Sequence, residues 1–199
     1  MGQSSDYEIA QYLTYSAQCL TEAMADPEFI RAAGKIVDVI YEALRAGNKI
    51  LLAGNGGSAG DAQHIAGEFL SRLYQDRAPL PAIALTTDSS IITAIANDFG
   101  YDHVFERQIA GLGNPGDVLI AISTSGRSVN ILKGIKTACN KGLTVIGFTG
   151  QTGNTMAAAC DFCLIAPSTS TPIIQQIHIT AAHVICALVE KRLFPRCDG

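Results

Sequence analysis

Short apolar runs alternate with amphipathic segments along most of the chain. Continuous apolar runs lie at 49–53, 81–85, 117–122, 143–148 and 161–165, and segments with helical spacing lie at 59–73, 89–97, 102–112, 128–141 and 172–193. Strands that are apolar throughout are buried on both faces, which is typical of a parallel sheet covered by helices. The pattern therefore predicts an α/β fold, a three-layer α/β/α sandwich with a five-stranded parallel sheet.

Two further helices are predicted before the first strand. One covers residues 6–24, and a second begins at Asp26-Pro27, a cap followed by proline, and ends near Gly47. No linker or repeat interrupts the chain. We therefore expect one domain over 1–199, with N-terminal helices over about 6–46 and a sheet-containing core over about 49–193. Because no strand precedes them, the two helices cover the sheet or pack against a second copy.

The composition narrows the class of protein. The chain has 199 residues, 48% of them hydrophobic and 16% charged, with a net charge of -4. This excludes a disordered chain and leaves no basic surface for nucleic acid. We find neither a signal segment nor an apolar run of the ~18–20 residues that span a bilayer. The prediction is a cytoplasmic protein without membrane or nucleic-acid partners, and the low charge indicates a surface covered by other subunits.

The six cysteines are scattered through predicted helices and strands. Cys160 and Cys163 form a single C-x-x-C. A zinc ribbon needs a second pair, and a redox motif needs the start of a helix. The cysteines, Cys197 included, are therefore predicted to be reduced thiols with packing roles.

Two loops after predicted strands have unusual chemistry. The first is glycine-rich and the second rich in hydroxyls, and both lead into a helix; they contain Asn55, Gly56, Gly57, Ser58 and Ser123, Thr124, Ser125, Ser128 respectively. Glycines allow close backbone approach, and helix starts offer free N–H groups, so both loops suit a phosphate. The alternative is that these residues only cap helices. Four hydroxyls in six positions favour an anion site, with the phosphate monoester of a small molecule as its ligand.

Polar residues also end the helix predicted at 89–97. Asn97 and Asp98 precede Phe99 and Gly100. They are ordinary turn residues, or they bind hydroxyls of a polyol ligand. The residues alone leave both readings open.

Titratable residues gather on two predicted helices. His64 and Glu68 are four apart, on one helix face, and the last helix contains Gln175, His178 and His183 in an apolar stretch. A histidine in such a stretch is ordinarily a packed core residue. With His64 and Glu68 also present, a metal site or an acid–base cluster competes with that reading.

Four long segments resemble the phosphoheptose isomerases, enzymes of the sugar isomerase (SIS) domain family with a flavodoxin-like fold. They are GNGGSAGDAQHIAGEFLSRL, AIALTTDSSIITAIANDFGYDHVF, GDVLIAISTSGRSVNIL and IIQQIHITAAHVICALVE. The resemblance covers nearly the whole chain. It implies conversion of sedoheptulose 7-phosphate to D-glycero-D-manno-heptose 7-phosphate, the first step of bacterial ADP-heptose or GDP-heptose biosynthesis. It also implies a cytoplasmic homotetramer with one zinc ion per subunit.

The resemblance assigns roles to matching positions. It places the metal ligands at His64, Glu68, Gln175 and His183. It places substrate-binding residues at Asn55, Gly56, Gly57, Ser58, Glu68, Arg72, Asn97, Asp98, Ser123, Thr124, Ser125, Ser128 and Gln175. Gln176 stands where many members have glutamate, which leaves the role of that position open.

An aldose–ketose isomerisation needs a proton removed next to the carbonyl and returned to the neighbouring carbon through an enediol(ate). Glu68 and His183 are the candidates for this transfer. We favour His183 as the base and Glu68 as its acid–base partner, although the reverse assignment fits equally well. Zinc would act as a Lewis acid on the substrate oxygens.

Helix geometry adds an expectation about assembly. Gln175 and His183 are eight residues apart, about 12 Å along a helix, so one ion is not easily reached by both. We therefore predict a site at a subunit interface with ligands from more than one chain. His178 points about 140° away from His183 and faces a neighbouring site or the core.

Two alternative functions fit the sequence less well. A replication-initiator-associating protein of the same fold is a tetrameric scaffold without catalysis, but it typically lacks the residues that match Glu68 and His183. A pentose-phosphate isomerase usually has added regulatory domains, for which 199 residues leave no room. Zinc content and turnover of a ketoheptose 7-phosphate separate these readings.

Overall fold

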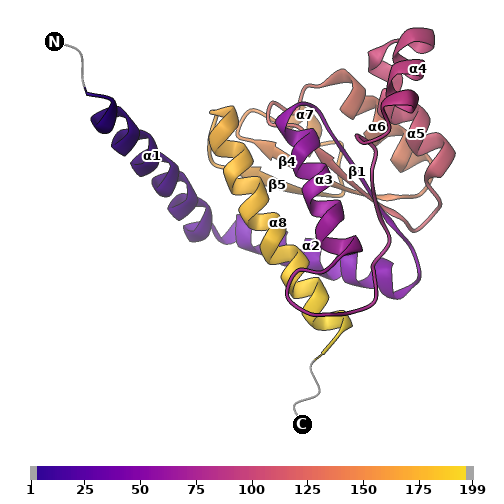
Figure 1. Cartoon of the computed structure of the whole chain (residues 1–199), viewed down its shortest axis with the longest axis horizontal. Helices are drawn as coiled ribbons and strands as arrows, with labels where there is room; N and C mark the ends of the chain where they lie inside the picture. The colour runs from indigo at the N-terminus through magenta and orange to yellow at the C-terminus, as the bar shows by residue number, and fades with distance from the viewer. Residues whose placement is uncertain (1–3, 196–199) are drawn as a thin grey trace.

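The computed structural model describes residues 4–195, which form the predicted α/β/α sandwich (Figure 1). The strands are β1 (Ile50–Gly54), β2 (Ala82–Ala84), β3 (Val118–Ile122), β4 (Thr144–Gly150) and β5 (Phe162–Ala166). The helices are α1 (Ser5–Ala25), α2 (Pro27–Arg45), α3 (Gly57–Leu70), α4 (Ser89–Phe99), α5 (Val104–Leu112), α6 (Val129–Asn140), α7 (Asn154–Ala157) and α8 (Thr171–Leu193).

The sheet is parallel throughout, with strand order β2-β1-β3-β4-β5. Side chains alternate between its faces, so Ile50 and Leu52 join one core while Leu51 and Ala53 join the other. The first core lies under α2, α3 and α8, and the second lies under α5 and α6. The predicted fold class and its five strands are therefore confirmed.

Most sequence-based boundaries agree with the structure to within a few residues. The helix predicted at 59–73 begins earlier, at Gly57, and ends at Leu70, because the chain turns at Ser71. The short α7 was not predicted, since four residues contain barely one helical turn. The helix predicted to begin at 102 begins at Val104, after a 3-10 turn at Tyr101–His103.

The two leading helices have different roles. Asp26 accepts a hydrogen bond from the Glu28 amide and caps α2, which covers the sheet with Ile36 and Ile40. The first helix, α1, extends away from the body of the molecule (Figure 1), and its buried residues, Cys19 and Ala23 in its second half, pack against α8. Much of the apolar surface of α1 is therefore left exposed.

The last helix, α8, passes through the first core between α2 and α3. Within residues 4–195 it is the one helix long and apolar enough to cross a membrane, with a mean hydropathy of 1.5 in its most apolar window, 44% of which is buried in this structure. Its buried residues pack against the sheet and the neighbouring helices, as in the core helix of a globular domain.

The cysteines within the described residues are free thiols, as predicted. The Sγ atoms of Cys160 and Cys163 both lie against Gly147 in β4. Burial raises the pKa of Cys160 to about 12 and that of Cys163 to about 11, which disfavours the reactive thiolate. Their packing role fits this geometry. Cys197 lies outside the described residues.

Candidate active site

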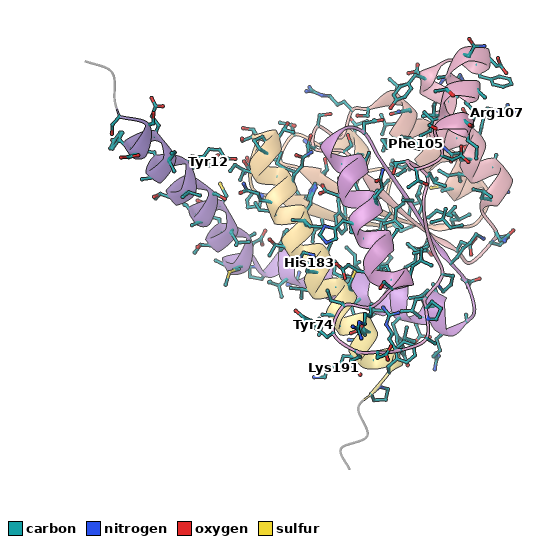
Figure 2. The ribbon with its side chains drawn as sticks, viewed as in Figure 1. Tyr12, Tyr74, Phe105, Arg107, His183 and Lys191 are labelled. Atoms are coloured by element: carbon teal, nitrogen blue, oxygen red, sulfur yellow. The ribbon has the colours of Figure 1, made fainter. Side chains whose placement is uncertain are left out.

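Three predicted site residues from two helices meet between α3 and α8. His64 Nε2 lies 3.1 Å from Glu68 Oε1 and 3.2 Å from His183 Nε2, and His183 Nε2 lies 3.9 Å from the same Glu68 oxygen. The two rings meet edge to face, with centroids 4.9 Å apart. His183 lies on the side of α8 that faces α3 (Figure 2). The structure thus brings together residues separated by more than a hundred positions.

The chemistry of this cluster fits a metal ion. One ligand atom from each of His64, Glu68 and His183 lies within 4.8 Å of the others. Two imidazoles and a carboxylate are a common donor set for catalytic zinc, which keeps a position for substrate or water. His64 and His183 are about half exposed, whereas Glu68 is mostly buried, so the cluster opens to one side.

Gln175 lies nearer to the starts of α3 and α8 than the three-residue cluster does. Its side-chain amide packs so closely on Gly57 that a Cβ there would collide with it. Gly57 precedes His64 by seven residues and Gln175 precedes His183 by eight, so α3 and α8 run side by side in the same direction. Gln175 thus lies about 10 Å nearer to the start of α3 than the three-residue cluster does. This placement agrees with the separation that helix geometry predicted.

The glycine loop after β1 is held by a network that the sequence did not reveal. The Asn55 side chain forms two reciprocal hydrogen bonds of 2.9 Å with the amide of Asn130, and its oxygen also accepts one of 3.0 Å from the Tyr101 hydroxyl. Asn55 and Tyr101 also line a cavity of about 110 Å³. The Asn55 amide is therefore engaged within the protein, and Asn130, buried in α6, fixes the loop. Because an asparagine at a helix start is an ordinary capping signal, the sequence did not indicate that Asn130 binds Asn55.

The hydroxyl-rich loop after β3 is held by hydrogen bonds among its own residues and by a turn at Gly126. Ser128 is the N-cap residue that precedes α6, yet its side chain makes no capping hydrogen bond there; its hydroxyl lies 3.2 Å from the Ser123 hydroxyl instead. The Ser125 hydroxyl accepts a 3.3 Å hydrogen bond from the Arg127 amide. Gly126 has a φ of 64° and lies against Gly153, where a side chain would collide with backbone. Simple helix capping thus does not account for this loop.

Other predicted site residues lie apart from this network. Asn97 and Asp98 are exposed at the end of α4, where the Asn97 amide donates a 2.8 Å hydrogen bond to Asp98. Arg72 is exposed in the segment after α3. Within one chain, these three side chains are not drawn into the His64–Glu68–His183 cluster by any hydrogen bond among the described residues. Their predicted contact with substrate stays a prediction.

Asp61 adds a carboxyl group one turn before His64. Its Oδ2 atom is buried and makes no hydrogen bond within the described part of the chain. Burial raises the pKa of Asp61, and the nearby His64 opposes that rise. Because acidic residues near helix starts are common, no sequence pattern singled out Asp61.

His178 and Gln176 face away from the cluster. His178 is buried, with Nε2 3.0 Å from the Thr149 carbonyl oxygen and its ring 5.5 Å from that of Phe148. Burial lowers its pKa to about 4, so the ring is neutral in the core. Gln176 turns toward α1, where it contacts Ser16 and the Tyr12 hydroxyl. The core reading of His178 is confirmed.

Comparison with known proteins gives the class of this fold and site. Residues 11–150 match the SIS domain family, to which the chain therefore belongs. Its sheet order and helix-covered faces agree with that class.

Within that class, the chain is similar to phosphoheptose isomerases. The chain is 52% identical to the one from Bradyrhizobium sp. over 97% of this chain and 98% of that protein, and 51% identical to the one from Aneurinibacillus thermoaerophilus over 96% of each. The phosphoheptose isomerase structure from Neisseria gonorrhoeae superposes with a TM-score of 0.89 at 37% identity, covering 94% of this chain and 100% of that one. The structure from Francisella tularensis gives 0.90 at 35%, covering 95% and 100%. The chain belongs to the phosphoheptose isomerase family and is an isomerase.

Proposed function

We propose that the chain interconverts sedoheptulose 7-phosphate and D-glycero-D-manno-heptose 7-phosphate, in the cytoplasm, as the first step of activated-heptose synthesis. The observation that carries this proposal is the convergence of His64, Glu68 and His183 into one cluster. Two loops suited to a phosphate precede α3 and α6. Full-length similarity to phosphoheptose isomerases supports it. No observation favours the non-catalytic scaffold, and both residues that the scaffold family typically lacks are present.

The reaction moves a proton between neighbouring carbons. A base takes the proton from C1 of the ketose, electrons shift to give an enediol(ate), and the proton returns to C2 while the C1 oxygen becomes the aldehyde. Glu68 and His183 are the groups placed for this transfer, because an oxygen of one and a nitrogen of the other lie 3.9 Å apart. A substrate carbon pair lying alongside these two atoms would have one group near each carbon.

The same cluster would hold a zinc ion, one per subunit, with Gln175 supplied by a second chain as the fourth ligand. When bound, the ion would polarise the carbonyl and hydroxyl oxygens of the substrate. The Nε2 atom of His183 cannot hold an ion and accept a proton at once, so these two roles exclude each other within a single step. Glu68 has two oxygens and can use one for each purpose.

The rest of the substrate would be held by the two loops. The hydroxyls of Ser123, Thr124, Ser125 and Ser128, with the free N–H groups at the start of α6, would bind the phosphate. The glycine loop (Asn55, Gly56, Gly57 and Ser58) would bring backbone close to the sugar, and Arg72, Asn97 and Asp98 would contact the phosphate or the sugar hydroxyls.

The active form is proposed to be a homotetramer whose sites lie between subunits. Three observations support this. The chain has few charges, α1 exposes Ile9 and Leu13 to more than half of their area, and the cluster is open on one side. The separation of Gln175 from His183 along α8 also favours ligands from two chains.

The test is turnover of sedoheptulose 7-phosphate with the purified chain, together with its zinc content. Glu68→Gln and His183→Ala should each lower kcat by about 10²–10⁴-fold, the usual contribution of acid–base catalysis, while circular dichroism remains that of the native protein. His103→Ala, at a surface histidine outside the cluster, is the matched control. Absence of heptose turnover, or full activity in either variant, would refute the proposal.

A further inference from the structure

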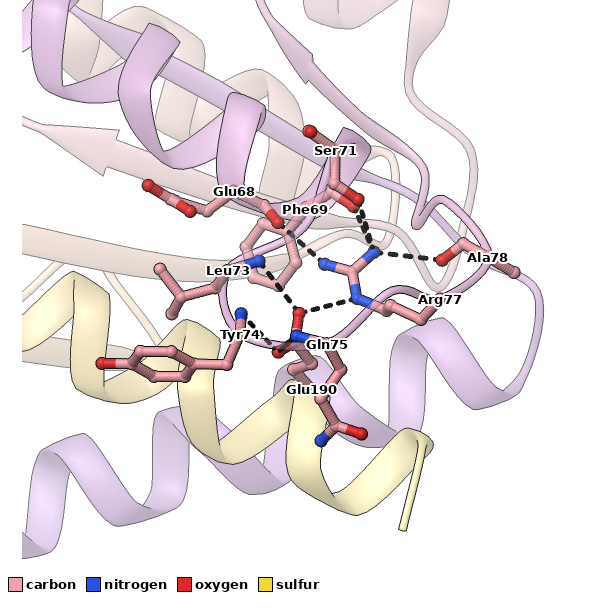
Figure 3. Close-up of polar contacts among 9 residues, drawn as sticks. All are labelled: Glu68, Phe69, Ser71, Leu73, Tyr74, Gln75, Arg77, Ala78 and Glu190. Atoms are coloured by element: carbon pink, nitrogen blue, oxygen red, sulfur yellow. Dashed lines mark hydrogen bonds and ion pairs between the residues drawn. The ribbon is translucent and has the colours of Figure 1, made fainter. Parts of the chain in front are cut away.

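A buried ion pair joins the end of α3 to α8, next to the catalytic cluster (Figure 3). Arg77 lies in the segment after α3 and Glu190 lies in the last turns of α8. Arg77 Nε is 2.9 Å from Glu190 Oε2, and only 2% of each side chain is exposed. An ion pair buried so completely needs further partners for both charges.

Glu190 obtains these partners from the backbone of the segment after α3. Its carboxylate accepts hydrogen bonds from the amides of Leu73 at 3.1 Å, Tyr74 at 2.9 Å and Gln75 at 3.0 Å. Burial by itself would raise its pKa, but these amides and Arg77 hold the pKa below its ordinary value. Glu190 is therefore a charged anchor on α8 around which this segment is folded.

Arg77 uses its remaining donors on the last turn of α3. One terminal nitrogen donates to the carbonyl oxygen of Glu68 and the other to that of Phe69, both at 2.8 Å. Glu68 lies in the last turn of α3, where carbonyls lack an amide partner within the helix, and the Phe69 carbonyl oxygen also accepts a 3.0 Å hydrogen bond from the Leu80 amide. The Arg77 guanidinium therefore binds the backbone of Glu68, whose side chain belongs to the cluster.

Both ends of the contact lie close to the cluster. Glu190 follows His183 by seven residues, about two turns, and so lies on the same side of α8. The buried apolar residues that α3 and α8 contribute to the first core include Ile65, Phe69 and Ile185. Apolar contacts are not directional and tolerate small sliding movements. Hydrogen bonds with fixed geometry do not, so the ion pair fixes the register of the two helices.

We propose that Arg77 and Glu190 are positioning residues for the isomerisation, and that their ion pair holds the Glu68 and His183 side chains at their working separation. The inference rests on the proposed function for its kinetic readout only. Neither residue touches the reacting atoms. Their effect on catalysis passes through the backbone of Glu68 and the register of α8.

The experiment compares Arg77→Met, Arg77→Lys and Glu190→Gln in the full chain. Arg77→Met should lower kcat at least tenfold with KM changed less than about threefold, because the hydroxyl-rich loop proposed to bind the phosphate precedes α6 and belongs to neither α3 nor α8. It should also weaken zinc binding by about 10–100-fold, the usual effect of residues that orient metal ligands. Arg77→Lys keeps the charge but loses the forked geometry and should fall between Arg77→Met and the native chain. Glu190→Gln keeps the shape and provides a folded variant should Arg77→Met not fold.

Two control variants separate positioning from stability. Ile135→Ala removes a buried side chain from the opposite core, so it lowers the melting temperature without touching α3 or α8. Arg192→Met removes an exposed ion pair between Arg192, on α8 itself, and Asp38, on α2. Both should retain the native kcat and zinc affinity below their melting temperatures.

Histidine ring spectra of ¹⁵N-labelled chains give a readout independent of turnover. The signals of His64 and His183 should shift in Arg77→Met and stay native in Ile135→Ala, while those of His103 and His178 stay native in both. If the native chain shows no turnover, the proposed function fails, but zinc affinity and ring signals still decide the positioning role. Native kcat, zinc affinity and ring signals in folded Arg77 and Glu190 variants would overturn the inference, as would losses no larger than those of Ile135→Ala.

Discussion

The Nε2 atoms of His64 and His183 face each other at 3.2 Å, although the two residues are 119 positions apart in the chain. At this distance the two ring nitrogens can be joined by a hydrogen bond. A cation placed near both nitrogens could use both lone pairs at once. The relationship therefore leads directly to a test of metal binding.

Zinc should stabilise the folded chain through this cluster. A ligand that binds only the native state at 100 times its Kd adds about 2.7 kcal/mol. We expect added zinc to raise the melting temperature of the chelator-treated native protein, and to have little effect on His64→Ala. His103→Ala, whose ring pairs with Glu106 outside the cluster, should respond as the native protein does. An equal rise in His64→Ala would place the ion elsewhere.

Gly57→Ala tests the role of Gln175 without altering Gln175 itself. The new methyl group would occupy the space of the Gln175 amide and displace that flexible side chain. We expect a loss of activity of at least tenfold with a change in the free energy of unfolding below about 1 kcal/mol, since alanine also favours the helix.

Gly60→Ala is the matched control for this substitution. It lies one turn further along α3, and no atom would lie within 4 Å of its added Cβ. Kinetic assays and urea unfolding of both variants separate the two effects. Native activity in Gly57→Ala would show that Gln175 has no role in the active site.

The buried His178 should make stability depend on pH. Its pKa is about 4 in the folded chain and 6.5 in the unfolded chain, so the unfolded state binds more protons between these values. This contribution is fully present above pH 6.5 and is lost as the pH falls toward 4. From pH 7 to pH 5 the loss is about 2 kcal/mol. In urea unfolding, His178→Gln should have a smaller pH dependence over this range; an unchanged dependence would contradict the assignment.

The exposed apolar side of α1 is the proposed contact between subunits. Leu13 is 61% exposed there, so Leu13→Lys would place a charge inside such a contact. We expect sedimentation analysis to show species smaller than a tetramer, with reduced turnover. Gln18→Lys adds the same charge on the other side of α1 and should remain tetrameric. A tetramer in both variants would exclude this side of α1 from the interface.

The fold could be predicted from the sequence because its strands and helices have clear periodic patterns. Ile50–Gly54 is apolar in every position yet divides its side chains between two cores, which is the property that indicates a buried parallel strand. The boundary of α3 was predicted less well. Its end depends on Arg77, which binds the carbonyls of Glu68 and Phe69 from eight or nine residues further on, and no local pattern reveals that contact.

The candidate site was only partly within reach of sequence reasoning. The spacing of His64 and Glu68 predicted a shared helix face, and the cluster with His183 required the resemblance as well. Asn130 and Glu190 were missed, because a capping residue and a charged residue near the end of a helix look ordinary in sequence. Their importance comes from partners 75 and 113 positions away.

The place of α8 in the chain affects how the enzyme is made. Helices and strands fold as they leave the ribosome, and α8 follows every strand of the sheet. It supplies His183 and also Ala181, Ile185 and Val189 of the first core. Until α8 has emerged, the nascent chain therefore has an open hydrophobic face and only one of the two histidines of the cluster. The cluster and the burial of that face are completed together, late in synthesis.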